Sequence, residues 1–373
     1  MRFDPEQQEL RRTVRTLLER AVGDDVWRLL ADQVGAHSLA IPEEYGGAGF
    51  SVLETHVVLE ELGAALAASG FLSTALAAQA ILATDSTEAK SALLPGIAEG
   101  RTHATLAWSE SGSWDAGMIQ ASAEQVGDSW VLSGTKEHVT DGAEADLFVV
   151  PARTATNDGS SGRRLGLLAV NASAAKVTSL ETVDPNRPQA TVRFDRSPAQ
   201  VLSEDAADAL ERILDLAAVA ISAEQLGGAQ RAFDLTLAYA KQRVQFGRPI
   251  GSFQAVKHRL ADLYTLLESA RSASYAAAFA AATATAATAT ATADTDTDTD
   301  TELHTAASRA KACCSEAFTT ITGEAIQLHG GIGITWEHPI HLYFKRAHST
   351  AHLFGTPSWH RRRYAEAVGI RAA

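Results

Sequence analysis

Two short segments of the chain carry side chains suited to binding a phosphate-bearing ligand. Arg243 follows a long predicted helix and precedes a Gly-Arg-Pro turn, so we expect it at a helix end that faces a cleft. Its guanidinium is a planar fork of donors that matches phosphate. Gln327 supplies an amide, and Gly330 with Gly331 lets the backbone approach a ligand without a Cβ in the way. Taken singly, these residues are also typical of a surface charge and of a helix terminator.

Two carboxylates near these segments are candidates for acid–base chemistry. Asp234 is on the predicted helix that precedes Arg243, and Glu337 lies between the glycine pair and Phe354. A surface or polar-contact role is the simpler interpretation of Asp234. Glu337 directly precedes His338-Pro339, which favours a helix-initiating role.

Other polar clusters have simpler explanations than ligand binding. The histidine pairs His338/His341 and His348/His352 have helical spacing but no third ligand, so we predict no metal site. The arginine run 361–363 is typical of a solvated or subunit-facing surface, with steering of an anionic ligand as the alternative.

Length and composition exclude several classes of protein. The chain has 373 residues, 46% of them hydrophobic, and can bury a large core in two or three domains. A net charge of −13 argues against nucleic acid or anionic membrane as a partner. No apolar run approaches the roughly 20 residues that span a bilayer. The start of the chain lacks a signal-peptide pattern, and the two cysteines, Cys313 and Cys314, are adjacent in a predicted helix. We therefore expect a cytoplasmic protein.

Apolar periodicity divides the chain into three predicted domains. Residues 1–101 are predicted to be helical and residues 102–205 to form a small antiparallel β domain. Residues 206–373 are predicted to be a helical bundle. The fold class is therefore mainly α with an inserted β domain. Long helices with apolar stripes suggest a dimer or a dimer of dimers.

Individual elements follow from the same patterns. Helices are predicted over 6–20, 51–67, 207–242 and 253–282, and a loop is predicted over 41–49. Short strand-like runs broken by Gly, Asp and Ser predict strands over 104–108, 130–134, 146–150, 165–170 and 190–194. The polar stretch 154–163 is predicted to be a loop within the β domain.

Residues 281–301 are predicted to be a low-complexity loop of the bundle, in which Ala/Thr alternation passes into repeated Thr-Asp. Threonine is a mediocre helix former and closely spaced aspartates repel one another, so we predict a solvated, mobile loop in the Asp-rich half. The spacing lacks the glycine and terminal glutamate of a calcium-binding loop.

Three segments together resemble signatures of the acyl-CoA dehydrogenase family. They are IPEEYGG at 41–47, RVQFGRPI at 243–250 with its continuation through Gln254, and QLHGGIG at 327–333. Helices, a small sheet domain and a helical bundle also occur in the family's order. The resemblance therefore covers nearly the whole chain.

The resemblance implies a flavin-dependent oxidoreductase. Members of the family remove the α-proton of an acyl-CoA thioester with a carboxylate and pass the β-hydrogen as hydride to the flavin N5 of FAD. An electron-transferring flavoprotein then accepts the electrons. The same resemblance implies that FAD is contacted by Arg243, Phe246, Gln254, Gln327, Gly330, Gly331, Thr140 and Thr356.

The family's base position is occupied by Phe354. The segment Leu353-Phe354-Gly355-Thr356 otherwise resembles the active-site loop of the family, in which a Glu directly precedes the Gly-Thr pair. A phenyl ring has no lone pair with which to accept a proton. The catalytic residue is therefore unknown from sequence. Asp234 is a weak surrogate, since some family members place the base on the corresponding helix.

Further departures lie in the β domain and beside the base position. Residues 109–115 replace the family's Thr-Glu-Pro loop, His138 stands at a flavin-packing aromatic position, and Pro357 and Ser358 alter the loop after Thr356. In the family these parts serve the subunit's own flavin, whereas the Arg-x-x-Phe-Gly and Gln-x-x-Gly-Gly groups reach the FAD of a neighbouring subunit. The chain thus resembles the non-catalytic subunit of bacterial heteromeric acyl-CoA dehydrogenases, an assembly type that occurs among enzymes acting on bulky, steroid-like CoA thioesters.

Three functions of different classes follow from this resemblance. The first is a subunit that completes the FAD site of a homologous partner. The second is an active homomeric acyl-CoA dehydrogenase with a relocated base. The third is a redox-inactive binding protein of the same fold. The resemblance implies a role in fatty acid or steroid CoA catabolism and is compatible with either kind of acyl group.

Overall fold

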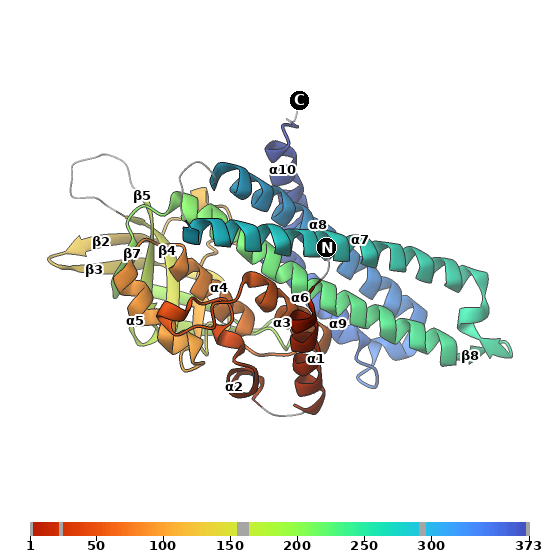
Figure 1. Ribbon diagram of the computed structural model, residues 1–373. Helices are drawn as coiled ribbons and strands as arrows, with labels where there is room; N and C mark the ends of the chain where they lie inside the picture. The colour runs from red at the N-terminus through yellow and green to blue at the C-terminus, as the bar shows by residue number, and fades with distance from the viewer. Residues whose placement is uncertain (1–2, 22–24, 155–163, 291–295, 371–373) are drawn as a thin grey trace. The chain divides into compact units, whose positions relative to one another are not determined.

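The computed structural model describes residues 3–21, 25–154, 164–290 and 296–370, which belong to two compact units (Figure 1). The first unit comprises Met1–Val22, His56–Ala67 and Ala218–Ala373, and the second comprises Gly23–Thr55 and Ala68–Ala217. None of the helices in these described ranges is both long and apolar enough to cross a membrane.

The second unit contains a seven-stranded sheet, with helices α2 (Val26–Leu29), α4 (Phe71–Leu82) and α5 (Thr87–Ala98). Strands β4, β2, β3, β7 and β5 pair in a closed circuit, β1 pairs with β4, and β6 pairs with β7. The strands are β1 (Ala104–Leu106), β2 (Ser122–Val126), β3 (Ser129–Thr140), β4 (Leu147–Thr154), β5 (Arg164–Asn171), β6 (Lys176–Leu180) and β7 (Gln189–Ser203).

Two features of this sheet differ from the sequence prediction. The sheet is not purely antiparallel, because β4 pairs in parallel with both β1 and β2. Strands β2 and β6 were absent from the prediction because their side chains are mostly exposed and show no apolar alternation. The buried faces of the other strands form a core that includes Leu132, Phe148 and Val192.

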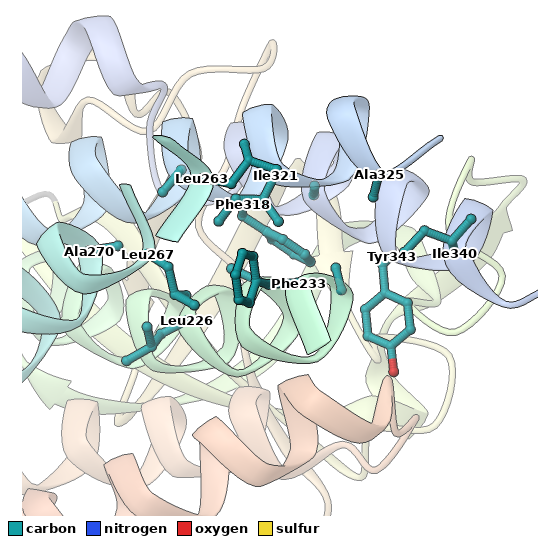
Figure 2. Close-up of a cluster of buried hydrophobic side chains, with 14 of the residues drawn as sticks. Leu226, Phe233, Leu263, Leu267, Ala270, Phe318, Ile321, Ala325, Ile340 and Tyr343 are labelled. Carbon is teal, nitrogen blue, oxygen red and sulfur yellow. The ribbon is translucent and has the colours of Figure 1, made fainter. Parts of the chain in front are cut away.

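The first unit is built from long helices that share one apolar core. Side chains of four helices point toward one another in Figure 2, among them Phe233, Leu267, Phe318 and Ile340. Tyr343 contributes its ring to this core, while its hydroxyl points away and donates to the backbone oxygen of Ala64 at 2.7 Å. The helices are α1 (Pro5–Arg20), most of α3 (Val52–Ala65), most of α6 (Ala207–Gln242), α7 (Gln254–Thr290), α8 (Asp296–His329), α9 (Ile340–His352) and α10 (Pro357–Ala367).

Helices α3 and α6 approach each other at two glycines. A Cβ added at Gly227 would lie 1.8 Å from the backbone oxygen of Glu60, and one at Gly63 would lie 2.0 Å from that of Glu224. Such distances are far inside van der Waals contact, so only glycine permits this crossing.

Helix α1 is attached to α3 by ion pairs to two buried carboxylates. Arg11 contacts Glu60 at 2.8 Å, and Arg15 donates to both carboxylate oxygens of Glu61 at 2.8 and 2.9 Å. Tyr275 of α7 also donates to Glu60. Because both carboxylates are buried, each needs these donors to offset the loss of water.

The low-complexity segment is more helical than its sequence predicts. Residues 281–290 belong to α7 and residues 296–301 to α8, so the predicted loop is wrong for these parts. Residues 291–295 lie outside the described residues. Alanine is the best helix former, and long helices gain a hydrogen bond for each residue added, which outweighs the modest cost of threonine.

Candidate functional site

An aromatic stack joins the ends of α6 and α8. The ring of Tyr239 stacks on His329 at 4.4 Å, and His329 lies 4.3 Å from the ring of His338. The Tyr239 hydroxyl also donates to the His329 backbone oxygen at 3.3 Å. Arg243 follows Tyr239 by about one helical turn and Gly330 directly follows His329, so the two predicted ligand-binding segments lie at the same end of the bundle.

The residues after α6 form a tight hairpin with an aromatic tip. Strand β8 (Val244–Gln245) pairs with β9 (Arg248–Pro249), and the ring of Phe246 is 92% exposed. Phe246 and Gly247 have φ of +54° and +76°. The left-handed conformation costs a non-glycine residue about 1–2 kcal/mol. An exposed, strained aromatic side chain contributes little to the core and is therefore a candidate contact for another molecule.

The segment after α8 is open to solvent. A Cβ added at Gly330 or Gly331 would meet no described atom within 4 Å. Farther along, Trp336 is 79% exposed, with the Lys345 ammonium 4.9 Å from its ring centre. The backbone at the two glycines is thus accessible to a ligand.

We call the surface formed by segments 241–259 and 327–338 the end face. Segment 241–259 has no acidic residue, and segment 327–338 has only Glu337. The glutamines Gln254 and Gln327 are exposed on the same two segments. The exposed basic side chains are Lys241, Arg243, Arg248, Lys257 and Arg259. On a chain of net charge −13, this local basic surface suits an anionic ligand.

The predicted hydroxyl of the β domain lies in a firmly held segment. Thr140 ends β3 and is buried, and its backbone oxygen accepts a hydrogen bond from the Thr105 hydroxyl at 2.7 Å. The next residue, Asp141, has φ of +55° and accepts from the Ser73 hydroxyl at 2.5 Å. His138 is exposed with φ of +53°, and its Nδ1 lies 3.1 Å from Gln189 Oε1.

The loop that begins at Ser109 is fixed by a buried lysine that sequence reasoning missed. Lys136 Nζ contacts Glu110 Oε1 at 2.6 Å and also donates to the backbone oxygens of Trp108 and Pro151. Burial lowers the Lys136 pKa to about 8, and Glu110 opposes this shift. Beside this pair, the Ser109 hydroxyl is buried without a hydrogen-bond partner in the described part of the chain. A bound ligand could complete that hydroxyl.

The loop at Phe354 is buried and tightly constrained. Phe354 is only 4% exposed and has φ of +58°, and Gly355 has φ of +101°. A Cβ at Gly355 would lie 2.5 Å from the Trp359 ring, so glycine is required there. Thr356 caps α10, since its hydroxyl accepts from the Trp359 backbone N–H at 3.2 Å.

Asp234 lines a different site from this loop. It is exposed on α6 and accepts a hydrogen bond from Gln230 Nε2 at 2.8 Å. It borders a pocket of about 730 Å³ whose lining does not include Phe354. The other lining residues are Arg11, Arg15, Leu18, Glu19, Glu60, Glu61, Ala64, Ala65, Gln230, Arg231, Arg271 and Tyr343.

The remaining polar candidates are Glu337, the histidine pairs and the arginine run 361–363. Glu337 is exposed, and α9 begins beyond it at Ile340. Within the described ranges, no group of three or more His, Cys, Asp or Glu residues could hold a metal ion. In the arginine run, Arg361 pairs with Glu316, whereas Arg363 is buried over the Trp359 ring and contacts His304.

Comparisons with known proteins match every part of this architecture. The family models described as acyl-CoA dehydrogenase N-terminal, middle and C-terminal domains match residues 4–101, 105–197 and 207–369. The acyl-CoA dehydrogenase IpdE2 of Mycolicibacterium smegmatis is 37% identical over 353 residues, which cover 92% of this chain and 88% of the relative. The acyl-CoA dehydrogenase FadE27 of Mycobacterium tuberculosis is 34% identical over 345 residues, covering 91% and 86%.

Solved structures of heteromeric enzymes have the same fold. The ChsE4-ChsE5 complex of Mycobacterium tuberculosis matches with a TM-score of 0.84 at 29% identity, covering 100% of this chain and 99% of that one. A variant of the Tcur3481-Tcur3483 steroid ACAD matches with a TM-score of 0.82 at 32% identity, covering 97% of each chain.

Proposed function

Because the chain belongs to the acyl-CoA dehydrogenase family of FAD-dependent oxidoreductases, we propose that it is a subunit that completes a partner's FAD site. In this proposal the homologous partner subunit supplies the proton-abstracting carboxylate. The basic and open character of the end face is the observation that carries the proposal.

The residues of the end face fit a dinucleotide. Arg243 can grip a pyrophosphate through its guanidinium fork, and Gln327 can hydrogen-bond polar edges of the ligand. Gly330 and Gly331 leave their backbone N–H groups approachable, and the exposed Phe246 ring can cover an apolar part. FAD, when bound, supplies the hydride acceptor of the reaction. Gln254 at the start of α7 is proposed as a further contact.

Proton abstraction is assigned to the partner because of Phe354. The α-proton of a thioester is only weakly acidic, so its removal needs a base within hydrogen-bond reach. The phenyl ring of Phe354 has no lone pair and is enclosed by protein. Asp234 borders a separate pocket and is not proposed as a substitute base. Thr140 and the buried Ser109 hydroxyl are proposed as ligand contacts of the β domain, and Thr356 is proposed as a ligand contact of the helical bundle.

The substrate is proposed to be a CoA thioester with a bulky, steroid-derived acyl group. Support comes from the likeness to the Tcur3481-Tcur3483 steroid ACAD. An electron-transferring flavoprotein is proposed as the electron acceptor. These assignments extend to this chain by similarity of sequence and fold.

Coexpression tests the proposal. The chain alone and the chain with a homologous partner that carries Glu before its Gly-Thr pair are purified. FAD content and turnover with an artificial electron acceptor are then measured. We expect stoichiometric FAD and activity only in the mixture. Full FAD and acyl-CoA turnover by the chain alone would refute the proposal.

Arg243→Ala provides a sharper arm of the same experiment. Loss of hydrogen bonds to a charged group is worth about 1.5–3 kcal/mol, so FAD should bind the complex about 10- to 100-fold more weakly. Arg309→Ala is the matched control, because Arg309 is also an exposed arginine but lies away from the end face, on α8. Equal FAD affinity of the two variants would contradict the role of the end face.

A further inference from the structure

Helix α9 ends against a buried lysine from α8. Lys311 is fully buried, and its Nζ donates to the backbone oxygens of Thr350 and Ala351 at 2.9 and 3.2 Å. The third bond goes to the Ser315 hydroxyl at 2.9 Å, which is itself hydrogen-bonded to Gln225 of α6. The last carbonyls of a helix lack partners within the helix and carry its negative dipole end. Lys311 therefore caps α9 directly before the Phe354 loop.

A second contact holds the Phe354 loop from the helix that follows it, α10. His360 of α10 is buried, and its Nε2 lies 2.7 Å from the backbone oxygen of Phe354. A carbonyl only accepts, so Nε2 carries the proton and donates. Burial lowers the His360 pKa to about 3, which keeps this ring in its neutral form. The hydrogen bond therefore persists without a charged imidazolium.

Together these contacts fix the backbone of the Phe354 loop in a conformation that is unfavourable by itself. Phe354 and Gly355 both have positive φ, a conformation that phenylalanine rarely adopts. Strained residues persist where their surroundings over-determine them, commonly at functional loops. The three acceptors of Lys311 are uncharged, so an ammonium is buried there without an opposing carboxylate among them. An apolar residue would fill the same space without that desolvation, which argues for a positional role.

We propose that Lys311 and His360 are positioning residues that fix the orientation of whatever side chain stands at position 354. This inference rests on the proposed function only in taking position 354 as the family's base position. The loop is thus preformed, and in this chain it holds a phenyl ring at position 354. Lys311 acts through the end of α9, and His360 acts through the Phe354 carbonyl.

We call the contacts of Lys311 and His360 with the Phe354 loop the clamp. Hydrogen exchange of the full chain, measured by mass spectrometry, tests it. Lys311→Met removes the cap and His360→Leu removes the second donor. Each should speed exchange of amides in 353–360 at least tenfold, while peptides from β4 and α7 exchange as in the wild type. Lys345→Met is the matched control on α9, and its 353–360 amides should exchange at the wild-type rate.

A conservative variant separates positioning from simple packing. His360→Gln keeps an N–H donor and should restore exchange to within about threefold of the wild type, unlike His360→Leu. Unchanged loop exchange in both Lys311→Met and His360→Leu would overturn the inference, as would a uniform rise over all peptides. If Lys311→Met does not fold, the His360 pair decides. No partner or FAD is needed, so this test can fail while the proposed function stands, and the reverse.

Discussion

The chain uses one local backbone device in two opposite environments. Phe246 and Phe354 both adopt a left-handed conformation, and each is followed by a glycine of positive φ. The first ring is 92% exposed on a free hairpin tip, and the second is 4% exposed in a clamped loop. Strain alone therefore does not define a role. The surroundings decide whether the turn offers a side chain to another molecule or holds it within the protein.

The largest expected contrast concerns chemistry at position 354. Phe354→Glu should supply a carboxylate in the preformed loop, whereas a carboxylate at position 246 would stand in solvent. General-base catalysis contributes about 10²- to 10⁴-fold, so flavin reduction by an acyl-CoA should rise at least about 100-fold in the Phe354→Glu chain when FAD is supplied in excess. The control is Phe246→Glu. No rise in a chain that holds FAD would contradict the assignment of position 354.

The two glycines should differ in their effect on stability. Gly355→Ala places a Cβ 2.5 Å from the Trp359 ring, whereas Gly247→Ala meets no atom within 4 Å. Both variants incur the left-handed backbone cost of about 1–2 kcal/mol, and only the first adds overpacking of about 1–3 kcal/mol. Urea unfolding should show the larger loss at Gly355. Equal losses would mean that the Phe354 loop relaxes freely.

Truncating the two phenyl rings sharpens the same comparison. Phe354→Ala should lower the free energy of unfolding by about 3–5 kcal/mol, since it empties a buried site. Phe246→Ala should change it by less than about 0.5 kcal/mol, as for other surface positions. Its effect should appear instead as weaker FAD retention in the complex with the partner. A Phe246→Ala complex that keeps FAD at wild-type affinity would remove Phe246 from the proposed contact set.

The two clamp residues should respond differently to pH. The Lys311 pKa falls from 10.5 to about 7 through burial, so the unfolded chain binds more protons between these values and stability rises with pH across that window. The His360 pKa falls from 6.5 to about 3, also through burial, so its stabilisation is lost as pH falls below 6.5.

Unfolding measured across pH checks these signs. Lys311→Met should remove a slope of up to about 1.4 kcal/mol per pH unit in the alkaline window. His360→Leu should flatten the acid limb instead. His56, whose pKa burial lowers to about 3, adds a similar acid slope, so each variant is compared with the wild type rather than with a flat line. Identical slopes in variant and parent would show that the group has the same pKa in the folded and the unfolded chain.

The sequence predicts the fold better than it predicts the surroundings of the site. The long helix over 207–242 was predicted at its observed bounds, because its apolar periodicity is continuous. The exposed strands β2 and β6 have no such pattern, and the sequence predicts a loop over the Ala/Thr segment 281–290, which the structure shows as helix because alanine favours helix.

Contacts that depend on side chains far apart in the sequence could not be predicted. Lys136 and Lys311 look like ordinary surface charges until the fold buries them beside backbone carbonyls. The stack of Tyr239 on His329 likewise appears only once α6 and α8 end together. A lysine among apolar neighbours is a signal for Lys311, which lies between Ala310 and Ala312. Lys136 has polar neighbours in the sequence and gives no such signal.

The stack of Tyr239, His329 and His338 joins the segments 243–250 and 327–333 into one structural element. The Tyr239 hydroxyl is hydrogen-bonded to the backbone directly ahead of Gly330, so this contact connects the helix end before the arginine hairpin to the glycine turn. Transplanting this surface onto another scaffold would accordingly require moving the three rings along with both loops. Grafting either loop by itself would supply the right residues without the orientation that the three rings give them.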